Sequence, residues 1–244
     1  MLPEYNGLSR ENFRGRNPYE GYQRACGIRY AKIIEQAKED EVFVEAWTLA
    51  QSRSVVSPFK LTNLYLLVRY FLPRLDPSDI IEFGTFRGGS AMFLAKLAQA
   101  YLPGIRIFGL DSFAGMPKTD KTIDGHNAGD FSETSLEDVE MAKNNAGLDN
   151  LTLVKGLFSD TTAGVLEQCK GISLAHIDCD LYHPALAAFE DVRLKMVPGG
   201  YIVFDDALEA SCLGAMQAVE DIVEKYRLRC EQVDPHIVFR YPPI

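Results

Sequence analysis

Four aspartates follow two short apolar runs in the second half of the chain. The run "HIDCDLY" carries Asp178 and Asp180, and the run "YIVFDDA" carries Asp205 and Asp206. Both runs are typical of buried strands that end in carboxylates. If the two strands are parallel neighbours, their carboxyl ends lie at one edge of the sheet, where open α/β sheets bind ligands. Four carboxylates in a partly dry site repel one another, so either some are protonated or a cation neutralises them.

The oxygen-only donor set of these aspartates suits a hard cation. A site with few protein ligands that retains water favours Mg²⁺ over a cation enclosed by protein. Zinc is disfavoured because no cysteine pair supports it, although the nearby His176 and His183 mean that zinc is not excluded as the metal. A bound divalent cation lowers the pKa of a coordinated hydroxyl, and a carboxylate just outside its ligands can take the proton. The cluster therefore indicates a metal site that activates a hydroxyl.

The individual roles within the cluster depend on local geometry. Asp178 and Asp180 point to opposite faces if the strand continues through both, but both reach one site if the chain turns at Cys179. One of Asp205 and Asp206 could instead cap the following helix.

A glycine-rich turn earlier in the chain indicates a nucleotide ligand. The stretch "IIEFGTFRGGSA" at 80–91 is typical of a strand, a tight turn and a helix start. Its GxxxGG spacing departs from the dinucleotide fingerprint, and Glu82 at the strand end would repel a pyrophosphate. Asp111 ends the next strand, where a carboxylate commonly binds ribose hydroxyls. S-adenosylmethionine, which carries an ammonium and no phosphate, fits this pair, unless both carboxylates merely cap local backbone.

The order of motifs along the chain resembles the macrocin O-methyltransferase family. The resemblance rests on "EFGTFRGGSA", "GLDSFAGMP", "GDFSET", "KGLFSD", "HIDCDLY" and "PGGYIVFDDA", and it covers about residues 54–220. It implies a class I methyltransferase that binds S-adenosylmethionine and a divalent cation, usually magnesium. It also implies an acceptor hydroxyl on a glycosylated natural product or another polyol.

The same resemblance implies roles for individual residues. Glu82 and the glycines from Gly84 to Gly89 would line the methionine end of the cofactor, Asp111 would hold its ribose, and Phe158 would form an apolar wall beside the adenine. The full cofactor set implied in this way is Glu82, Gly84, Gly88, Ser90, Asp111, Ser112 and Phe158. The metal would be held by Asp178, Asp205 and Asp206, with Asp180 as the catalytic base.

The elements that must position these residues alternate between strands and helices, which predicts a mostly parallel sheet covered on both faces. With the resemblance, we expect an α/β, Rossmann-like class I methyltransferase fold with a seven-stranded sheet and added N-terminal helices. Strands are expected at 79–84, 105–111, 151–156, 172–178, 200–206, 227–233 and 236–241. Helices are expected over 21–53, 60–72, 90–102, 165–170, 184–196 and 213–226.

Two regions stand apart from the alternation. Residues 1–55 would form an N-terminal arm and helices that serve the acceptor or an oligomer, and residues 56–244 the methyltransferase domain. Residues 112–135 are rich in Gly, Pro, Asp and Thr, and a connection of this length predicts a lid over the ligand. His126 in this segment would touch substrate or simply be solvated, whereas His176 inside an apolar run predicts a hydrogen-bonded core histidine.

Composition narrows the partners. A net charge of -9 and the lack of a basic stretch argue against nucleic acid, and five cysteines without CxxC spacing predict a reducing compartment. The N-terminus has no signal-peptide pattern and no apolar run of membrane-spanning length is present, so we expect a cytoplasmic protein without membrane contact. The expected partner is a small-molecule acceptor. A homo-oligomer, a dimer or larger, would use the N-terminal helices and "FRYPPI".

Three other functions remain open at this point. A catechol O-methyltransferase would differ only in its acceptor pocket. A non-catalytic S-adenosylmethionine-binding module would have no use for the acidic cluster. A nicotinamide dehydrogenase would require the GxGxxG spacing, which this turn lacks.

Overall fold

The structure is a computed structural model that describes residues 32–242. The predicted N-terminal arm, which precedes the helical region at 21–53, and the first part of that region lie outside the described residues. Within the described part, that region forms two helices, α2 (Ile33–Ala37) and α3 (Glu41–Ala50). Asp40 separates them because its carboxylate accepts a hydrogen bond from the N–H of Val42 at 3.0 Å and so caps α3.

The next helical segment begins at a proline and changes character near its end. Ser57 caps α4 (Pro58–Leu66), whose proline occupies the first helical turn, where no backbone donor is needed. The helix continues as a π-helical turn, Leu67–Phe71, and a 3₁₀ turn, Leu72–Arg74. The prediction of a helix over 60–72 is thus confirmed in position.

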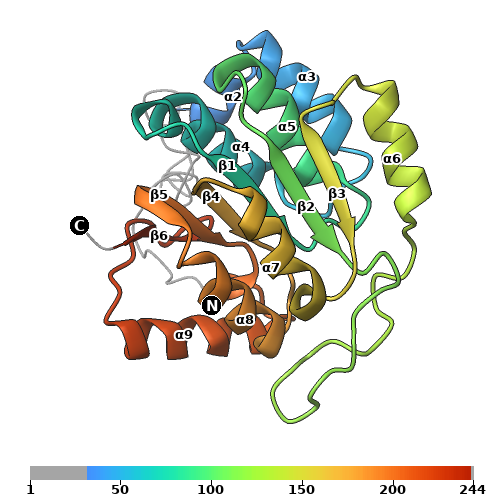
Figure 1. Ribbon diagram of the computed structural model, residues 1–244, viewed down its shortest axis with the longest axis vertical. Helices are drawn as coiled ribbons and strands as arrows, with labels where there is room; N and C mark the ends of the chain where they lie inside the picture. The colour runs from blue at the N-terminus through green and yellow to red at the C-terminus, as the bar shows by residue number, and fades with distance from the viewer. Residues whose placement is uncertain (1–31, 243–244) are drawn as a thin grey trace, which may run out of the picture.

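The described residues contain one six-stranded sheet with the strand order β3-β2-β1-β4-β5-β6 (Figure 1). Strands β1 to β5 are parallel, and β6 pairs antiparallel with β5 at one edge. The chain order reverses between β1 and β4, which creates the crevice where such sheets bind ligands. The strands are β1 (Asp79–Phe83), β2 (Ile107–Asp111), β3 (Leu151–Lys155), β4 (Ile172–Ile177), β5 (Met196–Phe204) and β6 (Ile237–Tyr241).

The α/β prediction is confirmed, but the expected count of seven strands is wrong. Residues 227–233 form no strand in the described structure, and only Gln232 makes an isolated bridge, to Val238. The reason is that the segment does not alternate between buried and exposed residues: Leu228 is buried, but the next three residues, Arg229, Cys230 and Glu231, are all exposed.

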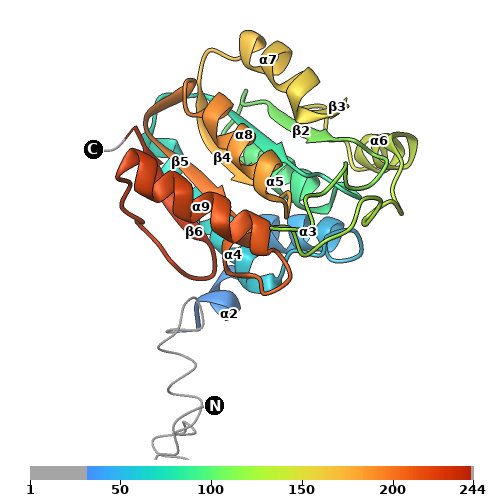
Figure 2. The same cartoon turned by 90° about the horizontal axis from the view of Figure 1, so that it is seen from below.

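Helices cover both faces of the sheet. One face packs against α3, α4 and α5 (Gly89–Tyr101), and the other against α7 (Phe158–Gln168), α8 (Tyr182–Val192) and α9 (Leu213–Tyr226), as Figure 2 shows. Helix α6 (Leu136–Asn145) lies beside the β3 edge. Its sequence is largely polar and buries only Val139 fully, which explains why no apolar period predicts it.

Residues 112–135 form no helix or strand, as expected from their composition, and run as a long loop between β2 and α6 (Figure 1). The loop is tied internally: the N–H of Met116 donates to the carbonyl of Asp130 at 2.8 Å, and that of Gly129 to the carbonyl of Met116 at 3.0 Å. Asp124 ties it to the domain by accepting from the N–H of Tyr182 at 2.9 Å. The lid function of this loop stays a prediction.

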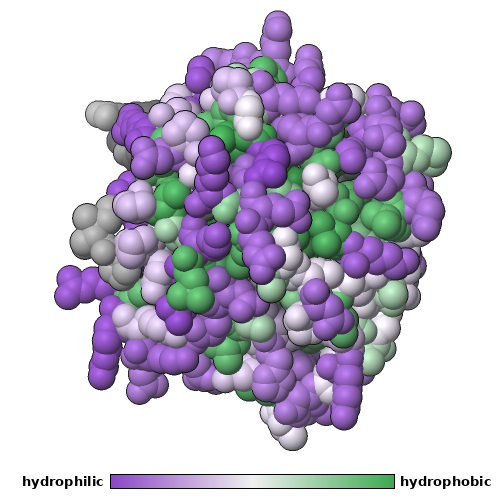
Figure 3. Space-filling model, in the orientation of Figure 1, coloured by the Kyte–Doolittle hydropathy of each residue, from purple (hydrophilic) through white to green (hydrophobic). Residues whose placement is uncertain are grey.

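Hydrophilic side chains cover much of the face seen in Figure 3, with hydrophobic residues scattered among them. Among the residues that the structure describes, no helix has the length and apolar character needed to cross a membrane.

Candidate active site

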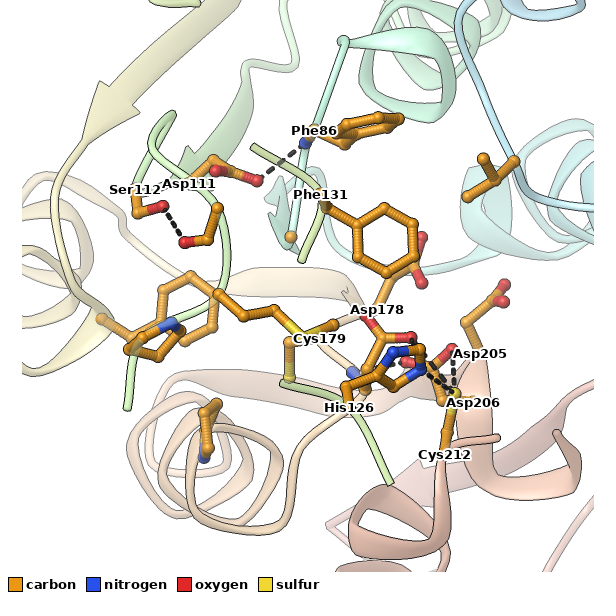
Figure 4. Close-up of a pocket in the computed structure, with 18 of the residues that line it drawn as sticks. Phe86, Asp111, Ser112, His126, Phe131, Asp178, Cys179, Asp205, Asp206 and Cys212 are labelled. Atoms are coloured by element: carbon orange, nitrogen blue, oxygen red, sulfur yellow. Dashed lines mark hydrogen bonds and ion pairs between the residues drawn. The ribbon is translucent and has the colours of Figure 1, made fainter. Parts of the chain in front are cut away.

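A cavity of about 650 Å³ opens at the carboxyl ends of the parallel strands (Figure 4). The loop 112–135 contributes Met116, His126 and Phe131 to its wall, and α4 contributes Lys60. The predicted site residues that line this cavity are Gly84, Asp111, Ser112, Phe158, Asp178, Asp180, Asp205 and Asp206.

Sheet register explains why residues so distant in the sequence meet here. Leu110, Phe83, Ile177 and Phe204 lie in one row across four adjacent strands. The residue that follows each of them therefore emerges at the same edge, and these residues are Asp111, Gly84, Asp178 and Asp205. The row is fixed by backbone hydrogen bonds from Asp178 N–H to the Phe83 carbonyl at 2.8 Å and from Asp205 N–H to the Ile177 carbonyl at 2.9 Å.

Gly84 is required at its place in this row. Its φ is +94°, a conformation that disfavours side chains, and a Cβ there would lie 1.6 Å from the carbonyl oxygen of Asp178. The glycine thus lets the ends of β1 and β4 approach each other at the cavity wall.

Carboxylates gather at the acidic end of the cavity. Oxygens of Asp178, Asp205 and Asp206 lie within 4.8 Å of one another, and the last two side chains are buried. Burial and the neighbouring carboxylates raise the pKa of Asp178 and of Asp206 well above the usual aspartate value. The protein supplies little positive charge to these two groups, so the cluster has the charge and the oxygen donors that a hard cation requires.

Asp205 is different because the protein itself neutralises it. Its Oδ2 accepts from Lys60 Nζ at 2.7 Å, and its Oδ1 accepts from His236 Nε2 at 2.8 Å and lies 3.2 Å from His176 Nε2. Burial alone would raise the pKa of Asp205, but the two histidine hydrogen bonds hold it well below its usual range. Lys60 also binds Glu209 at 2.7 Å, and both carboxylates keep its pKa above the usual lysine value despite burial.

His176 links this network to Glu82. Its Nδ1 lies 3.0 Å from Glu82 Oε1, so the ring stands between two carboxylates in the core. Burial lowers the pKa of His176, but hydrogen bonds to Asp205 and Glu82 outweigh it and raise the value to about 9. The prediction of a hydrogen-bonded core histidine is confirmed.

Asp180 reaches the cavity because the chain turns after β4. The strand ends at Ile177, and Asp180 adopts a left-handed φ of 59°, which aspartate tolerates better than most residues. Its N–H donates to Asp206 Oδ2 at 2.8 Å. The turn thus meets the condition under which Asp178 and Asp180 share one site. The carboxylates of Asp205 and Asp206 cap neither the following 3₁₀ turn nor α9.

The other end of the cavity is organised by Asp111. Its Oδ2 accepts from the N–H of Phe86 (Figure 4) and its Oδ1 from the N–H of Phe113, both at 2.7 Å. These bonds hold the carboxylate rigidly at the end of β2 and leave lone pairs free for a ligand. Ser112 Oγ donates to the carbonyl of Gly115 at 2.7 Å, and Phe158 packs against Phe83.

Three predicted cofactor residues do not line this cavity. Glu82 is fully buried and faces His176 on β4, Gly88 packs against Val139, and Ser90 is buried in the first turn of α5. Glu82 lies two residues before the edge formed by Gly84, which is why its side chain remains inside the sheet layer. One of its oxygens, Oε2, has no hydrogen-bond partner among residues 32–242.

The sequence did not single out Lys60, Cys212 or His236 as members of the site. A lysine inside the apolar run "SPFKLTNLYLL" is the one signal that could have marked Lys60. His126, for which the sequence permits either solvation or substrate contact, lines the cavity with 17% of its side chain exposed. Tyr182 donates its hydroxyl to Asp221 at 2.6 Å and does not line the cavity.

Comparison with known proteins gives a family match over most of the chain. The model described as "Macrocin-O-methyltransferase (TylF)" matches residues 36–239. A tetracenomycin-type relative from Streptomyces olivaceus, "8-demethyl-8-(2,3-dimethoxy-alpha-L-rhamnosyl)-tetracenomycin-C 4'-O-methyltransferase", is 29% identical over 75% of this chain and 71% of its own length. "Mycinamicin III 3''-O-methyltransferase" from Micromonospora griseorubida is 27% identical over 80% of this chain and 79% of its own length.

A solved structure agrees with the fold. "Structure of the O-methyltransferase NovP" superimposes with a TM-score of 0.69 at 19% identity, covering 82% of this chain and 97% of that one.

Proposed function

Because the chain belongs to the macrocin O-methyltransferase family and is therefore an O-methyltransferase, we propose that it transfers the methyl group of S-adenosylmethionine to a sugar hydroxyl of a natural product. One observation carries this proposal: a single cavity joins Asp111 at one end to the carboxylates of Asp178, Asp205 and Asp206 at the other. The names of the two curated relatives support a sugar as the acceptor, because the first names a rhamnosyl group and the second a glycosidic position.

For the cofactor, we propose that Asp111 binds the ribose and that Gly84 allows close approach of the ligand to the backbone. Asp111 is suited to this role because two backbone N–H groups already fix its orientation. Ser112 and Phe158 line the same part of the cavity and would enclose the adenosine. Glu82, Gly88 and Ser90 would act from behind this surface, by holding the glycine turn and His176 in place.

For the metal, we propose that Asp178, Asp205 and Asp206 hold Mg²⁺. The residues fit the ion, because their oxygens converge and because burial leaves two of the three carboxyl groups with raised pKa values. One lone pair remains for the ion on Asp205 Oδ2, because Oδ1 faces both histidines and Oδ2 accepts from Lys60 alone. When bound, the ion makes a coordinated hydroxyl more acidic and fixes its position.

The chain contributes the base and the exclusion of water. Asp180 lines the cavity beside Asp206 and would accept the hydroxyl proton as the methyl group is transferred in line. Its pKa is raised, chiefly by burial, which makes the carboxylate a stronger base than one in water. The loop 112–135 forms one wall and would shield the reacting atoms from solvent.

The family match and the structure bear on each of the three other functions that the sequence leaves open. The family match shows that the interpretation as a nicotinamide dehydrogenase is wrong, and it argues against a non-catalytic binding module. A catechol acceptor differs only in the pocket that receives it, and no observation in the described residues favours it.

The proposal is tested by calorimetric titration of S-adenosylmethionine into the protein with Mg²⁺ and with EDTA. We expect binding in both, at least tenfold weaker in Asp111→Asn because an amide cannot accept from both backbone N–H groups and still bind the ribose. Asp149→Asn, an exposed substitution before β3, is the control and should bind as the wild type does. Absence of binding under both conditions would overturn the proposed donor.

The acceptor is tested by incubating the protein with S-adenosylmethionine, Mg²⁺ and a panel of glycosylated natural products and catechols. Mass spectrometry should find one added methylene on a glycoside, and the product should disappear with EDTA and in Asp206→Ala. Methylation of catechols alone would overturn the assignment of a sugar acceptor. Full activity in EDTA would overturn the proposal that the reaction depends on a divalent metal.

A further inference from the structure

A second group of potential metal ligands adjoins the acidic cluster. It consists of His126 from the loop 112–135, Asp180 from the turn after β4, and Cys212 at the start of α9. Cys212 is buried, and the other two side chains are 17% and 20% exposed. Figure 4 shows His126 and Cys212 on the same side of the cavity, beside Asp206. We propose that these three residues form an inhibitory zinc site, distinct from the all-oxygen magnesium site.

The distances between the three donor atoms match those of a zinc centre. Cys212 Sγ lies 3.1 Å from Asp180 Oδ1 and 3.6 Å from His126 Nε2, and His126 Nε2 lies 3.8 Å from Asp180 Oδ1. A tetrahedral zinc ion with bonds of about 2.3 Å to sulfur and about 2.0 Å to nitrogen and oxygen separates its donors by about 3.3 to 3.6 Å. Each observed separation therefore needs to change by no more than about 0.5 Å.

A second observation points to a ligand on the same histidine. Nδ1 of His126 lies 3.4 Å from Asp130 Oδ2, on the side of the ring opposite the cysteine. A carboxylate at Nδ1 favours the tautomer in which Nε2 carries a lone pair, and metal-binding histidines commonly have such a partner. His126 is thus presented to Cys212 and Asp180 in the orientation that a metal ligand needs.

The chemistry of the donors selects the metal. A thiolate and an imidazole favour zinc over magnesium, because magnesium prefers oxygen ligands and zinc binds sulfur and nitrogen more strongly. Zinc binding would displace the proton of the Cys212 thiol, which in the metal-free protein donates to Asp180, and release it to solvent. Three protein ligands leave a fourth position for a water from the cavity.

Occupation of this site has two consequences. The ion would bind Asp180 Oδ1, and the carboxylate would then no longer be free to act as the proposed base. It would also tie the loop 112–135 to the start of α9. The expected inhibition rests on the proposed function, whereas the binding of zinc does not.

The test uses Co²⁺ as a coloured substitute for Zn²⁺, added to the reduced full-length protein in excess Mg²⁺. We expect one bound Co²⁺ with a thiolate-to-cobalt absorption band and the visible bands of a tetrahedral ion, both abolished by Zn²⁺. Cys212→Ser should lose the thiolate band. Cys230→Ser, at an exposed cysteine, and Cys26→Ser, outside the described residues, are matched controls that should retain it.

Two further variants test the contribution of His126 and its partner Asp130 to metal binding. His126→Gln should weaken the binding of Co²⁺ and Zn²⁺ at least tenfold. Asp130→Asn should weaken it about 10- to 100-fold, because without the carboxylate the ring of His126 is no longer held in the tautomer that leaves Nε2 free to bind a metal. Both residues lie on the surface loop, so these variants carry the test if Cys212→Ser fails to fold. Absence of a thiolate band, or an undiminished band in Cys212→Ser, would overturn the site. Unchanged affinity in both loop variants would overturn it as well.

A methylation assay separates this site from the proposed function. Zn²⁺ should inhibit the wild type in excess Mg²⁺ and inhibit Cys212→Ser at least tenfold less, relative to the rate of each protein in the same Mg²⁺ without zinc. Equal inhibition of both would place zinc at Asp178, Asp205 and Asp206 and overturn the inhibitory role. If no methyl transfer occurs at all, the proposed function fails while the cobalt spectrum still decides the metal site.

Discussion

Replacement of Lys60 by methionine should destabilise the protein far more than the same replacement of Lys96. Both lysines form an ion pair of 2.7 Å, Lys60 with Asp205 and Lys96 with Glu45. They differ in burial: the side chains of the first pair are 7% and 4% exposed, and those of the second 28% and 61%. The two N–O distances are equal, so the comparison contrasts a buried network, in which Lys60 also binds Glu209, with an exposed ion pair of the same length.

The magnitude follows from what each substitution leaves behind. Removal of one partner of a buried pair costs about 3 to 5 kcal/mol, since the other charge stays buried without compensation. Asp205 keeps His176 and His236, so we expect the lower end for Lys60→Met, about 3 kcal/mol. The exposed pair of Lys96 should contribute about 1 kcal/mol or less.

The assay is chemical and thermal unfolding in EDTA, so that no cation replaces the lost lysine charge. A loss of about 3 kcal/mol in a chain of this size lowers the melting temperature by about 6 to 12 °C, whereas Lys96→Met should lower it by no more than about 4 °C. Equal losses in the two variants would refute the reasoning, because the Asp205 carboxylate would then not depend on Lys60 for its compensation.

Two other predictions concern stability. Burial raises the pKa of Glu190, but hydrogen bonds from Lys225, Tyr226 and Arg193 outweigh it and lower the value from 4.5 to about 2. A folded-state pKa below the unfolded one means that the carboxylate stabilises the protein fully above about pH 4.5 and loses this effect as the pH falls toward 2. The cost of Glu190→Gln in urea unfolding should therefore shrink between neutral pH and about pH 3, and a constant difference would contradict the assignment. Gly84→Ala should abolish the native fold or cost more than about 4 kcal/mol, because its Cβ would lie 1.6 Å from the Asp178 carbonyl oxygen. Gly104→Ala, with a similar φ of +86° and nothing within 4 Å, should cost only about 1 to 2 kcal/mol; similar circular dichroism melts of the two variants would show that the β1–β4 contact is not tight.

The positions of the strand-end residues could be predicted because they depend on one rule. Asp111, Asp178 and Asp205 each follow an apolar run, and parallel strands bring their carboxyl ends to one edge. The same rule fails for Glu82 because it depends on where the strand ends. A shift of two residues, from Gly84 back to Glu82, moves a side chain from the cavity wall into the sheet layer.

The sequence could not predict the residues that come to the site from outside the sheet. Lys60 lies on α4, 145 residues before Asp205, and His236 lies just before β6, 31 residues after it, yet both contact its carboxylate. Neither is marked by periodicity, since a single polar residue in an apolar helix or before an edge strand has many structural explanations. Helix α6 was missed for the related reason that its stability comes from caps and position: Ser135 accepts from Asp138 N–H, and only Val139 is buried.

The structure also divides the charge of the four aspartates in a way that their spacing does not reveal. Strong repulsion requires either protons or a cation, and the protein uses its own cations for one carboxylate only. Lys60 and His176, whose pKa is raised, converge on Asp205 as cations, and His236, whose pKa burial lowers, adds a neutral hydrogen-bond donor, so Asp205 keeps its negative charge at a low pKa. Asp178 and Asp206 receive no comparable donors, and their pKa values rise accordingly. The raised pKa values favour the protonated forms of Asp178 and Asp206, whereas Asp205 stays ionised, so the cluster carries less repulsive charge than four free carboxylates would. That division explains how four aspartates can share one edge of the sheet in the folded protein.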